Sequence, residues 1–360
     1  MVGSGLVGLF VAAACRESGL GVRVVDRAQP LAPPGASGAS GGMLGYRFEW
    51  YPPRSGFDLS VAANRRWQVW IERLGGAEAV GLISAGTVWI ATGEVAPVEV
   101  ELAEQSTQGL EAHPLETPAE RAEAEVVVPA GGQAWLLSDE WAVDPRRVVR
   151  RLLARAEERG IEVLGDEPVL GLSRKGDRIQ GVRTPSGVHP AGAVVLATGA
   201  WSDASWLAEV GVVPPPIRSV PGQVAFVDRG PTRVVRVLHG GPYVIPRRDG
   251  TAVVGATTEG GRVARVEADV LQALLDRARA FVPCLAEARI RGGAAGIRPQ
   301  TPDKHPVVGP AGPDGLYWAT GHGRSGVHLG PLTGEVVAHL VAGTAPGLDL
   351  SPWDPARFGR

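Results

Sequence analysis

The chain opens with Met1-Val2-Gly3-Ser4-Gly5-Leu6-Val7-Gly8, a stretch whose glycines follow the spacing Gly-x-Gly-x-x-Gly. An apolar run with the character of a helix follows and leads into Val22-Arg23-Val24-Val25-Asp26. A phosphate-binding turn, a crossover helix, a second strand and a terminal acid in this order are typical of a dinucleotide-binding βαβ unit. The opening stretch therefore predicts an α/β domain with a Rossmann-like sheet.

Each part of this unit has a separate physical role. Gly3 permits the tight turn, Gly5 lets the backbone approach a pyrophosphate, and Gly8 lets the helix pack closely on the strand. The pyrophosphate would lie on the free N–H groups at the start of the helix, where the helix dipole favours negative charge. Asp26 would accept hydrogen bonds from the adenosine ribose, and its carboxylate disfavours a 2′-phosphate. These residues predict a cofactor with an ADP half, FAD or NAD, rather than NADP.

The first strand of the unit is expected to be short. A strand usually supplies about five or six residues, whereas only Met1 and Val2 precede the first glycine. We interpret this as a start site assigned downstream of the true one, and the shortened strand puts the affinity for the cofactor in question. A secretory signal at residues 5–15 is disfavoured, because no basic stretch precedes them and a strand with an acid follows.

Length, charge and cysteine content limit the classes to which the protein can belong. A chain of 360 residues can form one large or two medium domains. Its net charge of −2, without a basic run, argues against nucleic acid or an anionic membrane surface. No apolar run reaches the ~18–20 residues of a spanning helix, and Cys15 and Cys284 are isolated, so we expect neither a metal site nor a disulfide framework. These properties predict a cytoplasmic protein that acts on small molecules, and they are compatible with a homo-oligomer.

Three stretches have the pattern of nucleotide-domain pieces, and strand-rich segments separate them. The first piece is residues 1–27. The second has a helix from Asp144-Pro145 to Arg159 and buried strands at 161–164 and 193–199, and the third covers residues 316–342 with a helix from about Pro331. The strand-rich segments lie at 87–92, 122–138, 220–227, 234–238, 243–246 and 251–256. This pattern predicts one nucleotide domain interrupted twice by a mostly antiparallel second domain.

Four further segments carry candidate chemistry. The small-residue loop 34–44 lets backbone lie against something flat or anionic, although a flexible linker has the same composition. Tyr243 begins a predicted hairpin, and such a tyrosine is more often a core or interface residue than a ligand contact. Arg298 is equally a structural ion-pair partner or a clamp for a carboxylate. The loop 320–331 exposes N–H groups that would stabilise a reduced flavin, and its histidines are expected to have no catalytic role.

Taken in order, these segments resemble the D-amino-acid oxidase-like flavoenzymes, in particular the glycine oxidases of thiamine biosynthesis. The resemblance covers nearly the whole chain and includes the glycine fingerprint with Asp26, the loop ending Gly42-Met43-Leu44, Val143-Asp144-Pro145, Glu167-Pro168-Val169-Leu170, residues 197–202, residues 220–223, Tyr243 to Arg247, residues 255–257, Gly296-Ile297-Arg298-Pro299 and residues 321–326. The opening motif alone is weak evidence, whereas the ordered set is specific for the superfamily.

The resemblance implies a noncovalently bound FAD. The residues that it assigns to the cofactor are Gly3, Gly5, Leu6, Val7, Gly8, Asp26 and Arg27 around pyrophosphate and ribose, Val169, Gly199 and Trp201 at the adenine nucleotide, Ser37, Gly42 and Met43 along the isoalloxazine, and Gly323, Arg324, Ser325, Gly326 and Val327 at its pyrimidine edge. The cysteine that holds flavin covalently in monomeric sarcosine oxidases has no counterpart, since Cys284 precedes Arg298.

The resemblance also implies the catalytic residues and the reaction. Arg298 would bind the substrate carboxylate, Tyr243 would orient it, and Arg324 would be a further basic residue near the ring. A small amino acid or amine would transfer hydride from Cα to flavin N5 without a side-chain base, and its imine would hydrolyse to an α-keto acid. Molecular oxygen would reoxidise the flavin and give hydrogen peroxide. The bare sequence Gly240-Gly241-Pro242 before Tyr243 leaves the preferred side chain open.

The expected fold is therefore a glutathione-reductase-type, Rossmann-like FAD domain with an inserted α+β substrate domain. We assign residues 1–76, 137–205 and 293–360 to the FAD domain and residues 77–136 and 206–292 to the substrate domain. Two other hypotheses stay open: a dehydrogenase that uses a non-oxygen acceptor, and a cofactor-poor relative without activity. The interrupted topology disfavours a nicotinamide-dependent enzyme.

Overall fold

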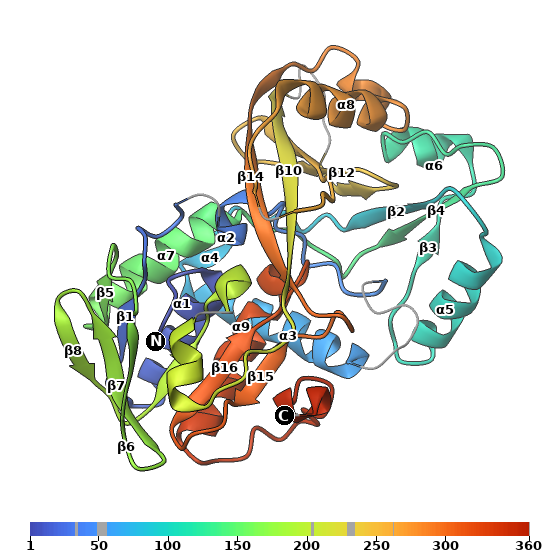
Figure 1. Ribbon diagram of the computed structural model, residues 1–360. Coiled ribbons are helices and arrows are strands. Elements are labelled where there is room, and N and C mark those ends of the chain that lie inside the picture. The colour runs from blue at the N-terminus through green and yellow to red at the C-terminus, as the bar shows by residue number, and fades with distance from the viewer. Residues whose placement is uncertain (33–34, 49–55, 203–204, 229–234, 262, 360) are drawn as a thin grey trace.

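The computed structural model describes residues 1–32, 35–48, 56–202, 205–228, 235–261 and 263–359. Two lobes are visible in Figure 1, one built on a mainly parallel sheet with helices and one on a larger, mainly antiparallel sheet. This is the mixed α/β architecture that the sequence predicts. Pro34 and Val234, each at the end of a segment discussed above, lie outside the described residues.

The sheet of the first lobe is held together at Val2. Its strands are β1 (Arg23–Val25), β5 (Glu162–Leu164), β9 (Val194–Leu196), β15 (Val307–Pro310) and β16 (Leu316–Thr320). Val2 forms parallel bridges to Val25 of β1 and to Leu196 of β9, and so occupies the central position between them. Only β15 runs antiparallel to its neighbour. The predicted short first strand is confirmed, because this position forms isolated bridges and no strand.

Helices pack on this sheet and on one another in one apolar cluster. They are α1 (Leu6–Glu17), α3 (Phe57–Arg73), α7 (Pro145–Glu158) and α9 (Gly326–Val341). The ring of Phe10 in α1 meets Trp67 and Trp70 of α3 edge-on, at centroid distances of 5.5 and 5.1 Å. The side chain of Asp144 caps α7, as its sequence predicts.

The predicted start of the last helix was wrong. We expected it near Pro331, because proline is favoured in the first turn of a helix. The helix begins instead at Gly326, and Pro331 lies inside it. Proline there removes one N–H bond near the helix start, which the packing of α9 against α1 tolerates. The glycine-rich loop is correspondingly shorter than predicted.

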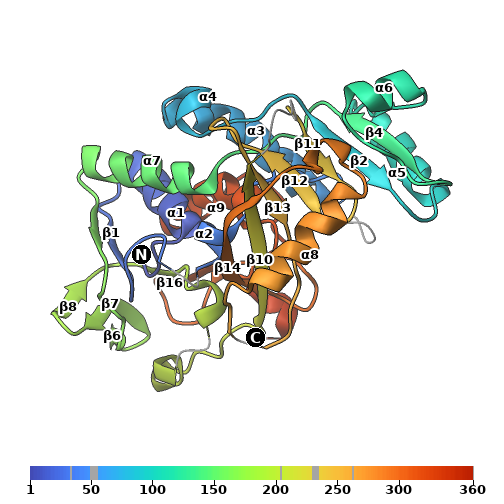
Figure 2. The same cartoon turned by 90° about the horizontal axis from the view of Figure 1, so that it is seen from above.

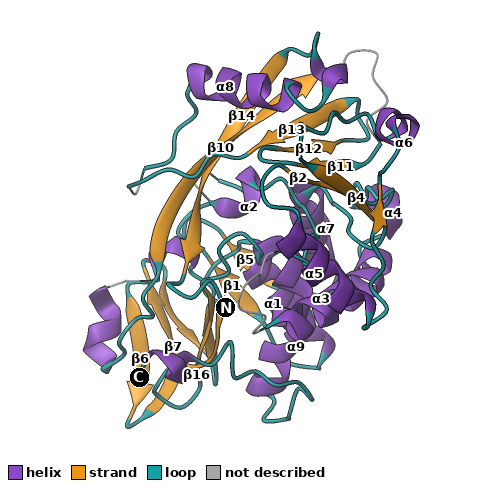
Figure 3. Ribbon diagram, turned by 90° about the vertical axis from the view of Figure 1, so that its right-hand side faces the viewer, coloured by secondary structure: helices purple, strands orange, loops and turns teal. Residues whose placement is uncertain are grey.

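The second lobe is built on an eight-stranded sheet in the order β14-β10-β13-β12-β11-β2-β4-β3. Its strands are β2 (Thr87–Ala91), β3 (His113–Pro114), β4 (Gln133–Leu137), β10 (Arg218–Asp228), β11 (Val237–His239), β12 (Tyr243–Pro246), β13 (Thr251–Gly255) and β14 (Ile290–Gln300). All pairs are antiparallel except β11 with β2. The long strands β10 and β14 reach from this lobe into the other (Figure 3). The domain boundary assigned at residue 293 thus falls inside β14.

The two faces of this sheet differ in what covers them. The helix α8 (Ala268–Arg279) packs on one face through Leu271, Leu274 and Leu275. Figure 2 shows α8 on the side of β10 and β14 away from α1 and α9. The short helix α2 (Ala36–Ala39) packs against β14 on the side of the first lobe. The second face therefore looks toward the first lobe.

Smaller elements complete the described chain. They are α4 (Gly76–Ala79), α5 (Ala96–Ser106), α6 (Pro118–Glu123), the antiparallel sheet of β6 (Gly171–Lys175), β7 (Arg178–Thr184) and β8 (Gly187–Pro190), and four 3-10 helices at 199–201, 205–210, 283–285 and 355–358. The segment 122–138, expected to be strand-rich, contains one strand, β4. The capping box of Thr117 and Glu120 with Pro118 is a helix signal just before it, and α6 begins there.

Candidate functional site

One cavity of about 750 Å³ lies where the two lobes meet. Every residue that the sequence assigned to cofactor or substrate lines it: Gly3, Gly5, Leu6, Val7, Gly8, Asp26, Arg27, Ser37, Gly42, Met43, Val169, Gly199, Trp201, Tyr243, Arg298, Gly323, Arg324, Ser325, Gly326 and Val327. The nucleotide lobe supplies one end of the cavity, and β10, β12 and β14 supply Gly222, Tyr243 and Arg298 at the other. Residues far apart in the chain are thus brought to one site.

The three glycines of the phosphate turn are of two kinds. Gly3 and Gly8 are needed for packing within the protein, whereas Gly5 faces the cavity. A Cβ on Gly8 would overlap the carbonyl oxygen of Gly3, and a Cβ on Gly3 would overlap that of Ala197. A Cβ on Gly5 would meet only Ser37 Oγ, at 3.5 Å. Gly5 precedes α1, whose first N–H groups point to a place that an anion can occupy. The turn therefore leaves a cradle that fits a pyrophosphate and that a side chain would fill.

Ser37 lies at the phosphate turn. Its hydroxyl accepts a hydrogen bond from the N–H of Leu6, at 2.9 Å, in the first turn of α1. The resemblance had placed Ser37 along the flavin ring together with Gly42 and Met43. Its contact with Leu6 favours a position beside the pyrophosphate instead.

The adenosine end is organised around Asp26. Its carboxylate accepts hydrogen bonds from the N–H and hydroxyl of Ser4 and from the N–H of Ala28. The next residue, Arg27, lays its guanidinium over the ring of Trp201, 3.7 Å from the centroid. Such a cation–π contact presents a flat surface at this end of the cavity. These groups suit an adenine nucleotide with free ribose hydroxyls.

At the opposite end, Arg298 and Tyr243 lie flat on the large sheet because two glycines lie beneath them. A Cβ on Gly222 would overlap the guanidinium of Arg298, and a Cβ on Gly255 would lie 2.5 Å from the hydroxyl of Tyr243. Arg298 Nη1 also donates to the carbonyl of Thr257 at 3.1 Å. The sequence predicted the arginine and the tyrosine but assigned no role to the glycines.

This end of the cavity is cationic. Burial raises the pKa of Tyr243, and the nearby Arg298, Arg247 and Arg324 oppose that rise. Within the described residues, the carboxylates that line the cavity are those of Asp26 and Glu167, both at the adenosine end. The guanidinium groups gathered at this end supply forked donors of the kind that bind a carboxylate.

Arg247 anchors the loop between these two ends. It is buried and donates to the carbonyls of Gly41, at 2.8 Å, and Val143, at 3.1 Å. Gly41 and Gly42 line the cavity, and the carbonyl of Val143 lies where a Cβ on Gly42 would be. An arginine next to a hairpin turn is expected at the surface, so no local pattern predicts this role.

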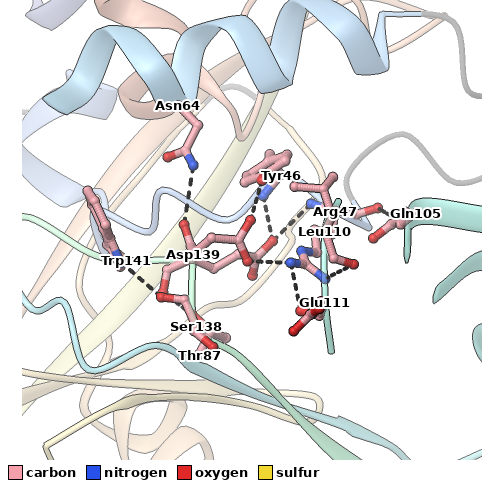
Figure 4. Close-up of polar contacts among 11 residues, drawn as sticks. Tyr46, Arg47, Asn64, Thr87, Gln105, Leu110, Glu111, Ser138, Asp139 and Trp141 are labelled. Atoms are coloured by element: carbon pink, nitrogen blue, oxygen red, sulfur yellow. Dashed lines mark hydrogen bonds and ion pairs between the residues drawn. The ribbon is translucent and has the colours of Figure 1, made fainter. Parts of the chain in front are cut away.

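A buried polar cluster fixes the segment that follows this loop. Glu140 Oε1 accepts from the N–H groups of Tyr46 and Arg47 at 2.8 and 2.9 Å. The guanidinium of Arg47 pairs with Asp139 and donates to the carbonyls of residues 110 and 111, and Asp139 also accepts from the Tyr46 hydroxyl (Figure 4). The cluster joins the loop 43–48 to the strand end at 138–140. Sequence patterns do not reveal it, because charged residues are expected on the surface.

Glu140 is expected to give the folded protein a measurable pH dependence. Burial raises the pKa of its carboxyl from 4.5 to about 7, so the folded state holds the proton more tightly than the unfolded state. Stability should therefore fall as the pH rises from about 4.5 to about 7, by an amount on the order of a few kcal/mol. Glu140→Gln should flatten this fall, as measured by urea unfolding at pH 5 and pH 8. The exposed Glu158→Gln is the control, and equal slopes in all three proteins would contradict the assignment.

His322 and His328, the histidines of the predicted loop 320–331, also line the cavity, and His328 lies in the first turn of α9. His322 bonds the hydroxyl of Thr333 at 2.9 Å, and burial lowers its pKa to about 3. His328 bonds the carbonyl of Ser60 at 2.9 Å and stacks on Tyr46. Each ring is therefore neutral and hydrogen-bonded, as expected for residues that hold the site in shape.

The described residues lack two further features. No group of three or more His, Cys, Asp or Glu side chains could hold a metal ion there. No helix in the described part of the chain has the length and apolar character needed to cross a membrane.

Comparison with known proteins agrees with this geometry. The family model for FAD dependent oxidoreductases, DAO, matches residues 1–340. A glycine oxidase from Pseudomonas aeruginosa is 32% identical over 372 residues, which cover 99% of this chain and 98% of the relative. The bifunctional protein ThiO/ThiG from Synechocystis is 29% identical over 99% of this chain, and the chain spans 53% of that longer protein.

A solved structure gives the same result in three dimensions. The crystal structure of glycine oxidase from Geobacillus kaustophilus superposes with a TM-score of 0.89 at 27% identity, covering 99% of this chain and 97% of the other. An iminodiacetate oxidase from Chelativorans, at 23% identity, shares the fold with a TM-score of 0.86 over 98% of both chains.

Proposed function

Since the chain belongs to the DAO family of FAD-dependent oxidoreductases, we propose that it oxidises glycine or another small amino acid or amine at its Cα–N bond. FAD is the cofactor of this family, and the chain is an FAD-dependent amino-acid oxidoreductase of the glycine oxidase type. The observation that carries the choice of substrate is the pair Arg298 and Tyr243, laid side by side over glycines at the cationic end of the cavity.

The chain's own residues would bind and orient both molecules. The turn at Gly5 would take the pyrophosphate, Asp26 the ribose, and the N–H groups at the start of α9 the flavin's pyrimidine edge. A bound FAD supplies the acceptor for a hydride from the substrate's Cα. Arg298 would bind the carboxylate through its two-pronged guanidinium, and Tyr243 would fix its orientation.

No side chain needs to remove a proton in this scheme. No Asp or Glu of the described residues lines the substrate end, and the lone pair of the substrate amine supplies the electrons. Arg324 adds positive charge where negative charge develops. We further propose that molecular oxygen is the final acceptor, that hydrogen peroxide forms, and that the imine product hydrolyses in water.

The proposal is tested by the spectrum of the purified protein with added FAD. We expect a bound flavin whose visible band bleaches under nitrogen when glycine, sarcosine or D-alanine is added. Peroxide formation on readmission of air, measured beside dye reduction, separates an oxidase from a dehydrogenase. A bound flavin that no small amine bleaches would contradict the proposal, and a protein that stays colourless with FAD would favour a cofactor-poor relative.

Gly255 gives a test of how Tyr243 is held. Gly255→Ala should push the tyrosine ring off the sheet and raise the KM for glycine about tenfold, as expected for loss of a hydrogen bond to a charged group. Tyr243→Phe should have a similar effect. If Gly255 acts by positioning the hydroxyl of Tyr243, the KM of the double variant Gly255→Ala/Tyr243→Phe should be little higher than that of either single variant. Gly93→Ala is the control, since a Cβ there would meet nothing within 4 Å. Fully additive effects would contradict the coupling.

A further inference from the structure

A row of aromatic side chains crosses the large sheet from the substrate end of the cavity. Tyr243 of β12 pairs with His239 of β11, His239 with Trp89 of β2, and Trp89 with Trp135 of β4. Residues paired in this way point to the same face of a sheet. His239 therefore lies beside Tyr243, one strand further from the strand that carries Arg298.

His239 is held flat in a stack of rings. Its imidazole lies 4.3 Å from the Trp89 ring, with an angle of 8° between the planes. Trp89 in turn stacks with Phe48 at 4.4 Å and 27°. Stacked aromatic rings at this spacing attract one another and resist rotation. The imidazole is consequently a firm wall rather than a mobile side chain.

The far end of the stack is anchored by the polar cluster around Glu140. Phe48 follows Tyr46 and Arg47, whose N–H groups both donate to Glu140. The carbonyl of Arg47 accepts from the amide of Gln105 at 3.0 Å. The backbone that carries Phe48 is thus fixed from both sides, which keeps the stack and His239 in place.

His239 also sets the limit of the cavity beside Tyr243. In the turn 239–243, every residue of which is described, the cavity is lined by His239, Gly241 and Tyr243. Gly241 brings no side chain, and a Cβ there would meet nothing within 4 Å. Burial and the nearby Arg324 lower the pKa of His239 to about 4. The ring is neutral at pH 7 and does not compete with Arg298 for a carboxylate.

We propose that His239 is a specificity-determining residue that limits the size of the group on the substrate's Cα. This inference rests on the proposed function, because it takes Arg298 and Tyr243 as the anchor of the carboxylate. With the carboxylate there, the imidazole fills the space that a longer side chain would enter along the row. The substrate class is then amino acids with little or no side chain, and branched D-amino acids are rejected.

The test compares two substrates in one variant. His239→Ala opens the cavity toward the face of Trp89, so the ratio of kcat/KM for D-valine to that for glycine should rise about tenfold or more. Trp135→Phe is the matched control, because Trp135 lies in the same row but not on the cavity wall. Its ratio should equal that of the wild type. If kcat/KM for D-valine and kcat/KM for glycine fell by the same factor in His239→Ala, the role of His239 would be merely structural and the proposal would be overturned.

A binding measurement separates this inference from the proposed function. Glycolate and D-2-hydroxyisovalerate carry the same carboxylate with a small and a branched substituent, and each can be titrated against the flavin spectrum without turnover. Relative binding of the branched ligand should rise in His239→Ala and be unchanged in Trp135→Phe. If no amine bleaches wild-type flavin, the proposed function fails while this ratio still reports on His239. His239→Asn is used if the alanine variant loses FAD, and an unchanged ratio in it overturns the proposal.

Discussion

Replacing Arg298 by alanine is expected to raise the KM for glycine by about two to three orders of magnitude, because a charged two-point contact with the carboxylate is lost. The guanidinium lies over Gly222 and donates to the carbonyl of Thr257, both at the opposite end of the cavity from the phosphate turn. The flavin spectrum and the FAD content should therefore stay those of the wild type. Steady-state kinetics, with the visible spectrum recorded on the same preparation, measure both quantities.

Three companion variants make this result specific. Arg298→Lys keeps the charge but loses the planar fork, so its KM should fall between wild type and alanine. Gly222→Ala keeps the arginine at position 298 but puts a methyl group where its guanidinium lies. The guanidinium must then move, so this variant should also raise the KM for glycine. Arg291→Ala, on the same strand, removes an exposed arginine paired with Asp228, and should change nothing in the kinetics. Wild-type KM in Arg298→Ala would remove that residue from the carboxylate site.

The sequence predicted those parts of the site that depend on local spacing. The glycine fingerprint, Asp26 and the helix cap at Asp144 are each defined within a few residues of chain, and all are found as expected. Arg298 and Tyr243 needed the family resemblance, since a lone arginine or tyrosine has several ordinary roles. The hairpin turn at Asp249-Gly250 was also predicted from the sequence, because an Asp-Gly pair between two apolar runs is typical of such a turn.

Features that depend on the pairing of distant strands could not be predicted. Gly222 matters because β10 lies beside β14, which carries Arg298, and Gly255 matters because β13 lies beside β12, which carries Tyr243. No local pattern marks these two among 50 glycines. The row from Tyr243 through His239 to Trp89 joins strands more than a hundred residues apart in the chain. From the sequence alone, Glu140 is expected at the surface like most acidic residues. Its burial results from the contact between the loop 43–48 and the residues that follow β4.

The second large effect is expected at the phosphate turn, where two glycine-to-alanine changes should fail in different ways. Gly8→Ala puts a methyl group onto the carbonyl of Gly3 and should destabilise the FAD-free protein by several kcal/mol, in the range of the larger single-residue effects. Gly5 has φ −64° and ψ 169°, which alanine adopts freely, and its Cβ would face the cavity. Gly5→Ala should therefore leave the FAD-free protein as stable as the wild type while its affinity for FAD falls at least about tenfold.

The comparison isolates the cofactor because the two glycines lie in the same turn. Urea unfolding of the FAD-free proteins measures the first effect, and titration of FAD followed by quenching of its fluorescence measures the second. Wild-type FAD affinity in Gly5→Ala would mean that the pyrophosphate does not approach this backbone, and the cradle would lose its assignment. A loss of stability equal to that of Gly8→Ala would mean instead that the protein itself requires Gly5. Only the predicted pair of results, one variant unstable and the other stable but poor in FAD, places the phosphates at the start of α1.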